Sequence, residues 1–429
     1  MRHTLSIVLI AALAALGIAA LSTGWLQRAQ APIYEDTAAA VLEILENRYF
    51  DTTLGEFNWN EVFGRYQETI HRVSTEAEFA ETMYQIFLEP GVSHLMYLPA
   101  ELDPRFARAF AEGGIGLDVG WLQDRAIVTG VALESPADHA GVHAGWEIVR
   151  IDGVDIGQIA TETRAHRWPP LNDRKLRCDL AADVLMHTYG QPGEEVEIAF
   201  GTPTEEREIL LTRAPRPRKS VLVEGLPPNF LEMEAQLLDE DTGYIRFSAF
   251  DPALLEWLVG ALDGMMDTSG LILDLRGNSG GFFEVRKALI DRLIGRRQLI
   301  WYHQYKDENA MIYSNSMSNR YRGEVVVLVD EGTASAAEEV AGSLQAVGRA
   351  TIIGTQTQGS ALVADWEVLP NGATLVFPIA VSRVYGGIIL EGNGVTPDVE
   401  IALNQQQLLD GIDAQLLAAI EWLQTAIGE

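Results

Sequence analysis

Three successive parts of the chain carry three different patterns of hydrophobic and polar residues. Between residues 33 and about 111, apolar side chains recur at helical spacing, as in YEDTAAAVLEILENRYF, which predicts a helical region. Residues 113–216 contain short apolar runs separated by turn glycines, which predicts a β domain. Only the run KLRCDLAADVLMHTYG in this middle part has the length and spacing of a helix.

The third part, residues 217–429, alternates strand patterns with helical patterns. Strands are predicted at GYIRFSAF, GLILDLRG, VVVLVD and ATIIGT, and helices begin near Asp251, Phe282 and Ala336. This alternation predicts a mostly parallel sheet with helices on its faces, followed by a strand-rich end. The sequence RAPRPRK, residues 213–219, is interpreted as a linker. We therefore expect a multidomain α/β protein with an N-terminal helical region (32–112), a β domain (113–216) and an α/β domain (217–429).

The first 31 residues have the pattern of an export signal or membrane anchor. Arg2 and His3 precede residues 4–27, which carry no charge. Their apolar part, 5–21, exceeds the roughly 7–15 residues of a cleaved signal and approaches the ~20 that span a bilayer. A cleaved signal and a retained span over residues 4–24 are both consistent with this pattern, and a buried core helix is the remaining alternative. Either of the first two places the bulk of the protein outside the cytoplasm, in a periplasmic or extracellular location.

Composition narrows the classes of partner. The chain has 31 basic and 61 acidic residues, a formal net charge of −30, so phosphate backbones are repelled and nucleic acid is not expected as a partner. Its single cysteine, Cys178, forms no internal disulfide and offers no cysteine cluster for zinc.

Ser335 is the candidate nucleophile. It lies among small residues after the apolar run VVVLV, where a strand is predicted to end and a helix to begin. First-turn amides of a helix have no helical acceptor, so the amide of Ala336 can bind an anion. The GNSGG turn can bring a second amide, from Gly280 or Gly281, to the same point, and two such donors suit a tetrahedral oxyanion. Without further context, a serine here would be interpreted as a helix cap.

The motifs LILDLRGNSGGFFEV, VVVLVDEGTASAAEEVAG and LEGNGVTPDVEI, in this order, resemble the tail-specific or C-terminal processing peptidases and their tricorn relatives. The resemblance implies a serine endopeptidase that needs no metal and no organic cofactor. It assigns the nucleophile to Ser335 and the oxyanion hole to Gly280, Gly281 and Ala336.

The base distinguishes two subgroups of this family. The commoner subgroup uses a lysine where this chain has Ser360, and no lysine follows Lys306. The tricorn-like subgroup uses a histidine, and its pattern matches His94 as base, Ser93 beside it, and Glu391 ahead of GVTPD as the supporting carboxylate. A histidine base with a reference pKa near ~6.5 predicts an acid limb of activity at roughly pH 6–7.5.

The middle part resembles a PDZ domain, from GIGLDV through VTGVALESPADHAGVHAGWEIVRIDGVDI. The resemblance implies that peptide carboxyl ends bind at Gly114, Ile115, Gly116 and Leu117, where free amides meet a strand edge. Residues 160–190 are interpreted as an insertion into this domain. The alternative to a peptide-binding PDZ domain is a β domain that serves only as a structural spacer.

Substrates implied by these resemblances are proteins or peptides, selected through their carboxyl termini. Two other functions remain open: a family member without catalysis that binds hydrophobic ligands or peptides, and a PDZ-centred scaffold.

Overall fold

The protein is described from a computed structural model that covers residues 33–50, 57–100, 108–166, 172–216, 223–226 and 230–428. The predicted signal or anchor, residues 1–31, lies outside these residues. Within the described ranges, no helix combines the length and the apolar character needed to cross a membrane.

The chain forms two compact units. The first contains the described residues up to Gly91, those between Leu95 and Asp103, and Ala364–Phe377. Its helices cover residues 33–48, α2 (Trp59–Arg72) and α3 (Glu76–Leu88), as the helical pattern predicts. Short strand β1 (Met96–Leu98) pairs antiparallel with the beginning of β18 (Thr374–Val384). The first unit thus draws a segment from far along the chain, beyond the predicted helical region.

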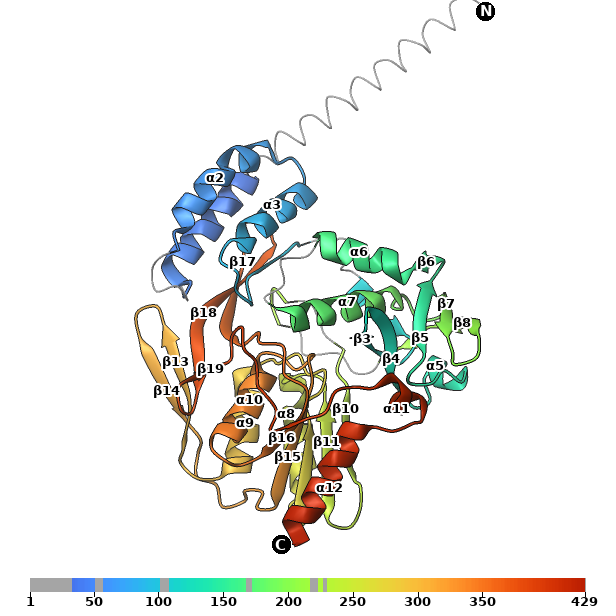
Figure 1. Cartoon of the computed structure of the whole chain (residues 1–429). Helices are drawn as coiled ribbons and strands as arrows, with labels where there is room; N and C mark the ends of the chain where they lie inside the picture. Colours follow the sequence, from blue (N-terminus) through green and yellow to red (C-terminus); the bar gives the residue numbers. More distant parts are fainter. Residues whose placement is uncertain are drawn as a thin grey trace, which may run out of the picture. The chain divides into compact units, whose positions relative to one another are not determined.

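The second unit includes the middle part of the chain, which is predicted to resemble a PDZ domain and is called the PDZ-like domain below; it is drawn mainly in green in Figure 1. Its antiparallel sheet has the order β3-β4-β5-β7-β8, and β6 pairs with β5. The strands are β3 (Leu117–Leu122), β4 (Arg125–Val131), β5 (Glu147–Ile151), β6 (Val154–Asp155), β7 (Glu195–Gly201) and β8 (Glu206–Thr212). The helices are α5 (Pro136–His139), α6 (Ile156–His166) and α7 (Asp173–His187). Helix α7 corresponds to the predicted helical run and lies within the insertion expected at residues 160–190, and α6 begins before this insertion and overlaps its start.

The expected linker at 213–219 is partly wrong. Ala214–Pro215 forms strand β9, which pairs with β2 (Gly113–Gly114). This short pairing closes the PDZ-like domain by bringing its first and last residues together.

A six-stranded sheet forms the centre of the α/β domain, in the order β10-β11-β12-β15-β16-β20. All of its pairs are parallel except β10 with β11, which confirms the prediction of a mostly parallel sheet. The strands are β10 (Met233–Leu237), β11 (Thr242–Phe247), β12 (Gly270–Asp274), β15 (Glu324–Val329), β16 (Thr351–Gly354) and β20 (Val399–Glu400).

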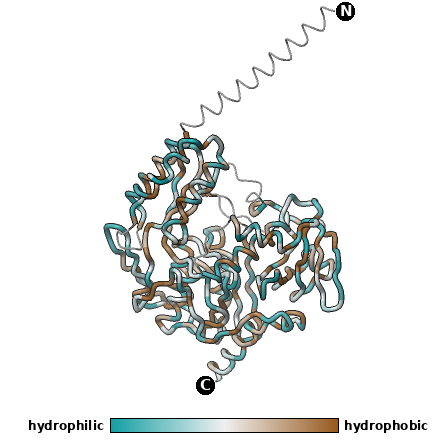
Figure 2. Tube along the Cα trace, turned by 45° about the horizontal axis from the view of Figure 1, so that its top comes forward, coloured by the Kyte–Doolittle hydropathy of each residue, from teal (hydrophilic) through white to brown (hydrophobic). Residues whose placement is uncertain are grey.

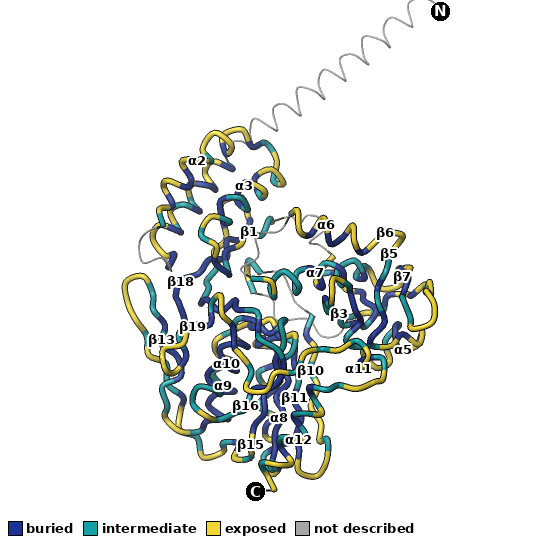
Figure 3. Tube along the Cα trace, viewed as in Figure 1, coloured by how far each residue is buried: buried dark blue, intermediate teal, exposed yellow. Residues whose placement is uncertain are grey.

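Alternate residues of these strands pack against helices on opposite faces. On one face, residues such as Leu271, Leu273 and Val327 pack with α8 (Leu255–Gly264), α9 (Phe283–Ile294) and α10 (Ala336–Ala346). On the other face, Ile272 and Val326 pack against α12 (Ala414–Gly428). Figure 3 shows the middle strands β11, β15 and β16 as largely buried, whereas the edge strand β10 is mostly exposed. Figure 2 shows hydrophobic and hydrophilic residues interspersed along the trace.

The carboxyl-terminal end was expected to be rich in strands and is instead mixed. An antiparallel sheet contains β13 (Leu299–Tyr305), β14 (Asn309–Tyr313), β17 (Leu362–Val368), β18 and β19 (Ile388–Ile389). Two helices follow, α11 (Gln405–Leu409) and α12, which the strand prediction missed. The second face of the central sheet is therefore covered by the last helix of the chain.

Candidate active site

Ser335 lies at a sharp turn between β15 and α10. Its backbone has φ 53° and ψ −121°, a conformation that costs a non-glycine residue free energy and persists only when neighbours hold it. The Ser335 N–H donates to the carbonyl of Ser360 at 2.8 Å and to Glu338 Oε2 at 3.1 Å. Ser335 stands at the N-cap position of α10, and the hydrogen bond from its N–H to Glu338 is the backbone contact of a capping box.

The hydroxyl of Ser335 contacts His94. The distance from His94 Nε2 to Ser335 Oγ is 3.0 Å, although 241 positions separate the residues in the chain. On the other side of the ring, His94 Nδ1 lies 2.6 Å from Ser93 Oγ. His94 also has a positive φ of 59°, which turns the backbone sharply directly after Ser93.

Glu391 completes this chain of contacts. Its Oε2 accepts from Ser93 Oγ at 2.8 Å and from the Ala361 N–H at 2.8 Å, and its Oε1 accepts from the Ser93 N–H at 2.8 Å. Burial raises the pKa of Glu391, while the hydrogen bonds from Ser93 and Ala361 oppose that change. The four predicted residues therefore lie in one hydrogen-bonded row: Ser335, His94, Ser93 and Glu391.

The direction of each hydrogen bond in this row follows from the number of protons. A hydroxyl has one proton, and an ionised carboxylate can only accept, so the Ser93 hydroxyl donates its hydrogen bond to Glu391. Ser93 Oγ must then accept from His94 Nδ1–H. The neutral imidazole consequently has its lone pair on Nε2, where it can accept the Ser335 proton.

The pKa of His94 is lowered to about 4, first by burial and then by the charges of Lys175 and Arg286. This is below the pH 6–7.5 expected for a histidine base, because neither burial nor these two cations is visible in the local sequence. The imidazole is therefore neutral throughout the neutral pH range.

Two of the three predicted oxyanion donors have a free amide. The amide of Gly280 donates to Asn278 Oδ1 at 3.0 Å. Among the described residues, the amides of Gly281 and Ala336 have no hydrogen-bond acceptor. Gly280 instead leaves space for the nucleophile, because a Cβ at this position would lie 2.6 Å from Ser335 Cβ and 2.8 Å from the Ala336 nitrogen. Only glycine allows the GNSGG turn to approach the nucleophile so closely.

Sequence reasoning missed Glu338. This fully buried carboxylate accepts from Ser335 N, from Thr357 Oγ1 at 2.5 Å, and from the amides of Gly359 at 2.7 Å and Ser360 at 2.9 Å. The spacing Ser-x-x-Glu at 335–338 is that of a capping box, which could have identified it.

Ser360, at the position of the family lysine, offers no base. Its side-chain oxygen is buried and lacks a hydrogen-bond partner among the described residues, and its carbonyl accepts the Ser335 N–H. The lysine whose charge does reach His94 is Lys175, from α7, and its Nζ is paired with Asp179. An ion-paired ammonium has no free lone pair, so Lys175 does not replace His94 as a base.

The N-terminal end of α7 contacts the loops that carry the site. Arg174 Nε donates to the Thr357 carbonyl at 2.7 Å, and Nη2 donates to the Asn393 carbonyl at 2.9 Å. The side chain of Asn172 donates to the Gln358 carbonyl at 2.9 Å. Helix α7 therefore supports the segment that surrounds Ser335.

The predicted peptide-binding loop lies at the start of β3, an edge strand of its sheet. Within it, the carbonyls of Ile115 and Gly116 accept from Ala137 and Ala132, and Gly116 has φ 78°. Gly114 belongs to β2, and Leu117 begins β3. An edge strand after a glycine turn is the arrangement that peptide addition to a sheet requires.

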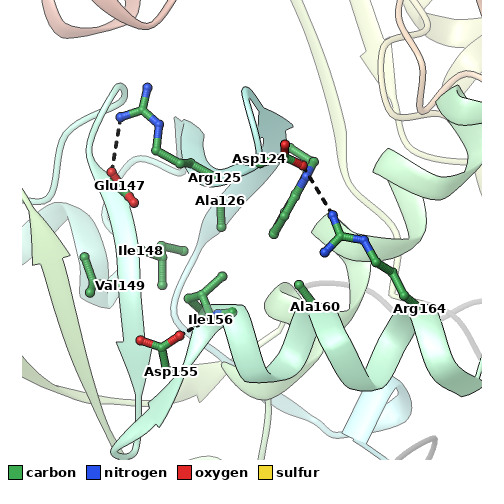
Figure 4. Close-up of a pocket in the computed structure, with 12 residues that line it drawn as sticks. Asp124, Arg125, Ala126, Glu147, Ile148, Val149, Asp155, Ile156, Ala160 and Arg164 are labelled. Atoms are coloured by element: carbon green, nitrogen blue, oxygen red, sulfur yellow. Dashed lines mark hydrogen bonds and ion pairs between the residues drawn. The ribbon is translucent and has the colours of Figure 1, made fainter.

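A separate hollow of about 170 Å³ lies elsewhere in the PDZ-like domain, between α6 and strands β4 and β5 (Figure 4). Ion pairs Arg125–Glu147 and Arg164–Asp124, at 3.2 and 3.3 Å, lie among its lining residues. It contains none of the predicted site residues.

The fold and the row of residues at Ser335 define the class of serine peptidases. Residues 241–401 match the family model described as peptidase family S41, and residues 39–87 match the tricorn protease C1 domain. Residues 241–401 therefore form a peptidase family S41 domain, which confirms the resemblance seen in the motifs of the chain.

Curated relatives agree with this assignment. The carboxy-terminal-processing protease of Bartonella bacilliformis is 27% identical over 390 residues, which cover 85% of this chain and 81% of the relative. The chloroplastic C-terminal processing peptidase of Tetradesmus obliquus is 26% identical over 303 residues, 68% of this chain and 58% of the relative.

Solved structures share the fold. The photosystem II D1 C-terminal processing protease has a TM-score of 0.57 at 21% identity, covering 90% of this chain and 98% of its own. Mature CPAF has a TM-score of 0.60 at 13% identity, covering 92% and 97%. The tricorn protease has a TM-score of 0.51 at 19% identity and covers 92% of this chain, but only 37% of its own length is matched.

Proposed function

We propose that this S41 peptidase is an endopeptidase that cleaves proteins through an acyl-enzyme on Ser335, with His94 as general base. The observation that carries the proposal is the 3.0 Å contact between Ser335 Oγ and a His94 Nε2 that has its lone pair free. Ser93 and Glu391 orient the ring and set its tautomer, and the hydrogen bonds at 2.6 and 2.8 Å support this role.

The reaction proceeds in two halves. Ser335 Oγ attacks the scissile carbonyl carbon while His94 Nε2 takes the hydroxyl proton, and the amides of Gly281 and Ala336 stabilise the oxyanion. The C–N bond then breaks as His94 returns this proton to the leaving amine. In the second half, water attacks the ester, His94 accepts a proton from it, and the proton passes to Ser335 Oγ as the acid is released.

The main alternative is a catalytically inactive member that binds hydrophobic ligands or peptides. The complete row of residues favours catalysis, because a binding module has no need of a histidine lone pair directed at a serine hydroxyl. Residues 33–429 should cleave unfolded casein, and the Ser335→Ala variant should not. Equal turnover by both proteins would rule out the nucleophile.

The PDZ-like domain is proposed to select substrates by their carboxyl termini, at Gly114–Leu117. A peptide with a free carboxylate should bind more tightly than its carboxamide, because only the carboxylate suits the loop amides. Gly116→Ala should abolish this preference, since its Cβ would lie 2.3 Å from Ser135 Cβ. Equal binding of both peptides to the unaltered protein would contradict carboxyl-end selection.

We also propose that the protein acts outside the cytoplasm, in a periplasmic or extracellular location. The support is the uncharged stretch at residues 4–27 behind Arg2 and His3. Expression of the full chain, followed by fractionation and N-terminal sequencing, would separate a cleaved signal from a retained span over residues 4–24. Recovery of uncleaved protein in the cytoplasm would contradict export.

A further inference from the structure

The carboxylate of Glu338 has surroundings unlike those of the other acids near the site. It is fully buried, and all its contacts in the described residues are with uncharged donors. Three are backbone amides, of Ser335, Gly359 and Ser360, and the fourth is the hydroxyl of Thr357. One side chain thereby joins the nucleophile's turn to the loop 357–360 behind it.

The Ser335 turn needs such support. Its φ of 53° with ψ −121° is a conformation that an alanine or serine rarely adopts, and local contacts must offset its cost. The Ser335 N–H has two acceptors, Glu338 Oε2 and the Ser360 carbonyl, while the Ser360 N–H returns to Glu338 Oε2. Thr357 is held in turn, because its hydroxyl accepts from the Val395 amide at 2.6 Å.

We propose that Glu338 is a positioning residue, whose ionised carboxylate holds the strained backbone of Ser335 against the loop 357–360 so that Oγ meets His94. This inference rests on the proposed role of Ser335 as nucleophile. An ionised carboxylate accepts all four hydrogen bonds. Protonation would place a hydrogen among four donors that already point at this group, and at least one of their contacts would be lost.

Glu338 and His94 titrate in different ranges. Burial raises the pKa of Glu338 to about 7, against the opposing effect of its hydrogen bonds, first among them the one from Thr357. His94, with Lys175 and Arg286 nearby, has its pKa lowered to about 4. Between pH 4 and 7 the base is therefore neutral and competent, whereas Glu338 is increasingly protonated as pH falls. A loss of reactivity on acidification near pH 7 is therefore not expected from His94, and we assign it to Glu338. Burial also raises the pKa of Glu391, so the Glu338→Gln variant is needed to separate the two carboxylates.

Glu339, the next residue of α10, provides a matched control. It is also buried, and burial raises its pKa as well. Its partners are different, because it forms an ion pair with Arg286 and lies 3.8 Å from His303 Nε2. Neutralising Glu339 removes a buried acid from the same helical turn without touching the loop 357–360.

The test is the rate at which a fluorophosphonate labels Ser335 between pH 4.5 and 9, in the unaltered protein and in Glu338→Gln and Glu339→Gln. The unaltered protein should show an inflection near pH 7. Glu338→Gln should label ~10²-fold more slowly at pH 8, as for a small misplacement of reacting groups, and should lack that inflection. Glu339→Gln should retain it. An unchanged inflection in Glu338→Gln would overturn the inference.

A second variant keeps the test decisive if Glu338→Gln does not fold. Thr357→Val removes one hydrogen bond that favours the ionised acid, so the inflection should move to higher pH, whereas Thr357→Ser should leave it in place. An inflection that does not move in Thr357→Val would count against Glu338. On unfolded casein, Thr357→Val should lower kcat at neutral pH and leave KM unchanged, as expected for a group that acts on Ser335 and not on substrate.

Failure of the proposed function would look different. Absence of labelling at Ser335 in the unaltered protein at every pH would refute the nucleophile. The side-chain carboxyl ¹³C resonance of Glu338 can be assigned as the one that is absent from the spectrum of Glu338→Gln. In the unaltered protein, its pH titration would report on Glu338 even without labelling of Ser335. Titration of this resonance near pH 7 would support the assignment of the inflection to Glu338, and titration below pH 5 would overturn that assignment. A carboxyl group that remains protonated up to pH 9 would overturn the positioning role of the ionised carboxylate.

Discussion

Two hydrogen-bonded networks meet at Ser335, one at its hydroxyl and one at its backbone. At the hydroxyl, His94, Ser93 and Glu391 form a single row in which each contact fixes the position of one proton. At the backbone, Glu338 gathers four donors around one carboxylate. In the proposed mechanism, the first network determines where the Ser335 proton goes, and the second determines where the Ser335 oxygen lies. Their separation means that chemistry and geometry can be impaired independently.

The largest effect is expected from removing either end of the proton path. Ser335→Ala and His94→Ala should each reduce kcat/KM on unfolded casein by at least ~10³-fold, the scale on which triad residues act. Both should keep their circular dichroism spectrum and lose little thermal stability, because neither side chain fills the core. Combining them should cost no more than the larger single loss. Additive losses would mean that the two residues do not act as one unit.

Glu391→Gln should have the next largest effect, about 10²-fold or more in kcat. The carboxamide can donate to Ser93, which would then be free to donate to His94 Nδ1 and would favour the wrong tautomer of the ring. The pH profile of kcat/KM should separate this from a structural defect. The activity of Glu391→Gln should be lower at every pH, and its pH profile should show no new acid limb between pH 5 and 8. Recovery of activity at alkaline pH would contradict the tautomer argument.

A smaller effect, roughly tenfold in kcat/KM, is expected for Arg174→Ala. The substitution leaves the carbonyls of Thr357 and Asn393 without their donor and loosens the loops that hold both networks. Arg174→Lys restores a charge without the fork of donors, so it should recover only part of the loss. Thermal unfolding should show a lower Tm for the alanine variant than for the unaltered protein. Full activity of the alanine variant would contradict a role of α7 in supporting the active site.

The smallest effect is expected for Ser360→Ala. The hydroxyl of Ser360 has no hydrogen-bond partner in the described structure, and its contacts to Glu338 and Ser335 are made by backbone atoms. We expect less than a threefold change in kcat/KM and an unchanged pH profile. Collapse of activity in this variant, with tolerance at His94, would show that the proton of Ser335 leaves by another route.

The fold was largely predictable from the sequence because its signals are local. Alternating apolar strands and helical runs identify β11, β12, β15 and α10 without knowledge of their neighbours. Helix α12 was missed, since its role depends on the sheet face left open by α8, α9 and α10. The segment Ala364–Phe377 groups with the first unit through pairing of β18 with β1, which lies almost 280 positions away in the chain.

The candidate site divides in the same way. Motif order identified Ser335, His94, Ser93 and Glu391 as a hypothesis, and the structure brings these four within hydrogen-bond distance. The environment that sets their pKa values was out of reach, because Lys175 and Arg286 approach His94 only through the tertiary fold. Glu338 had a local signal, the Ser-x-x-Glu spacing, but its bonds to Thr357 and Gly359 had none.

The most direct test of the proton path is fluorophosphonate labelling of the protein at pH 8, with the modified residue located by mass spectrometry of peptides. We predict one adduct, on Ser335, formed rapidly in the unaltered protein and at least ~10³-fold more slowly in His94→Ala, because the neutral imidazole must accept the hydroxyl proton as the bond to phosphorus forms. An adduct on a different serine, or equal labelling of Ser335 in His94→Ala, would contradict the account.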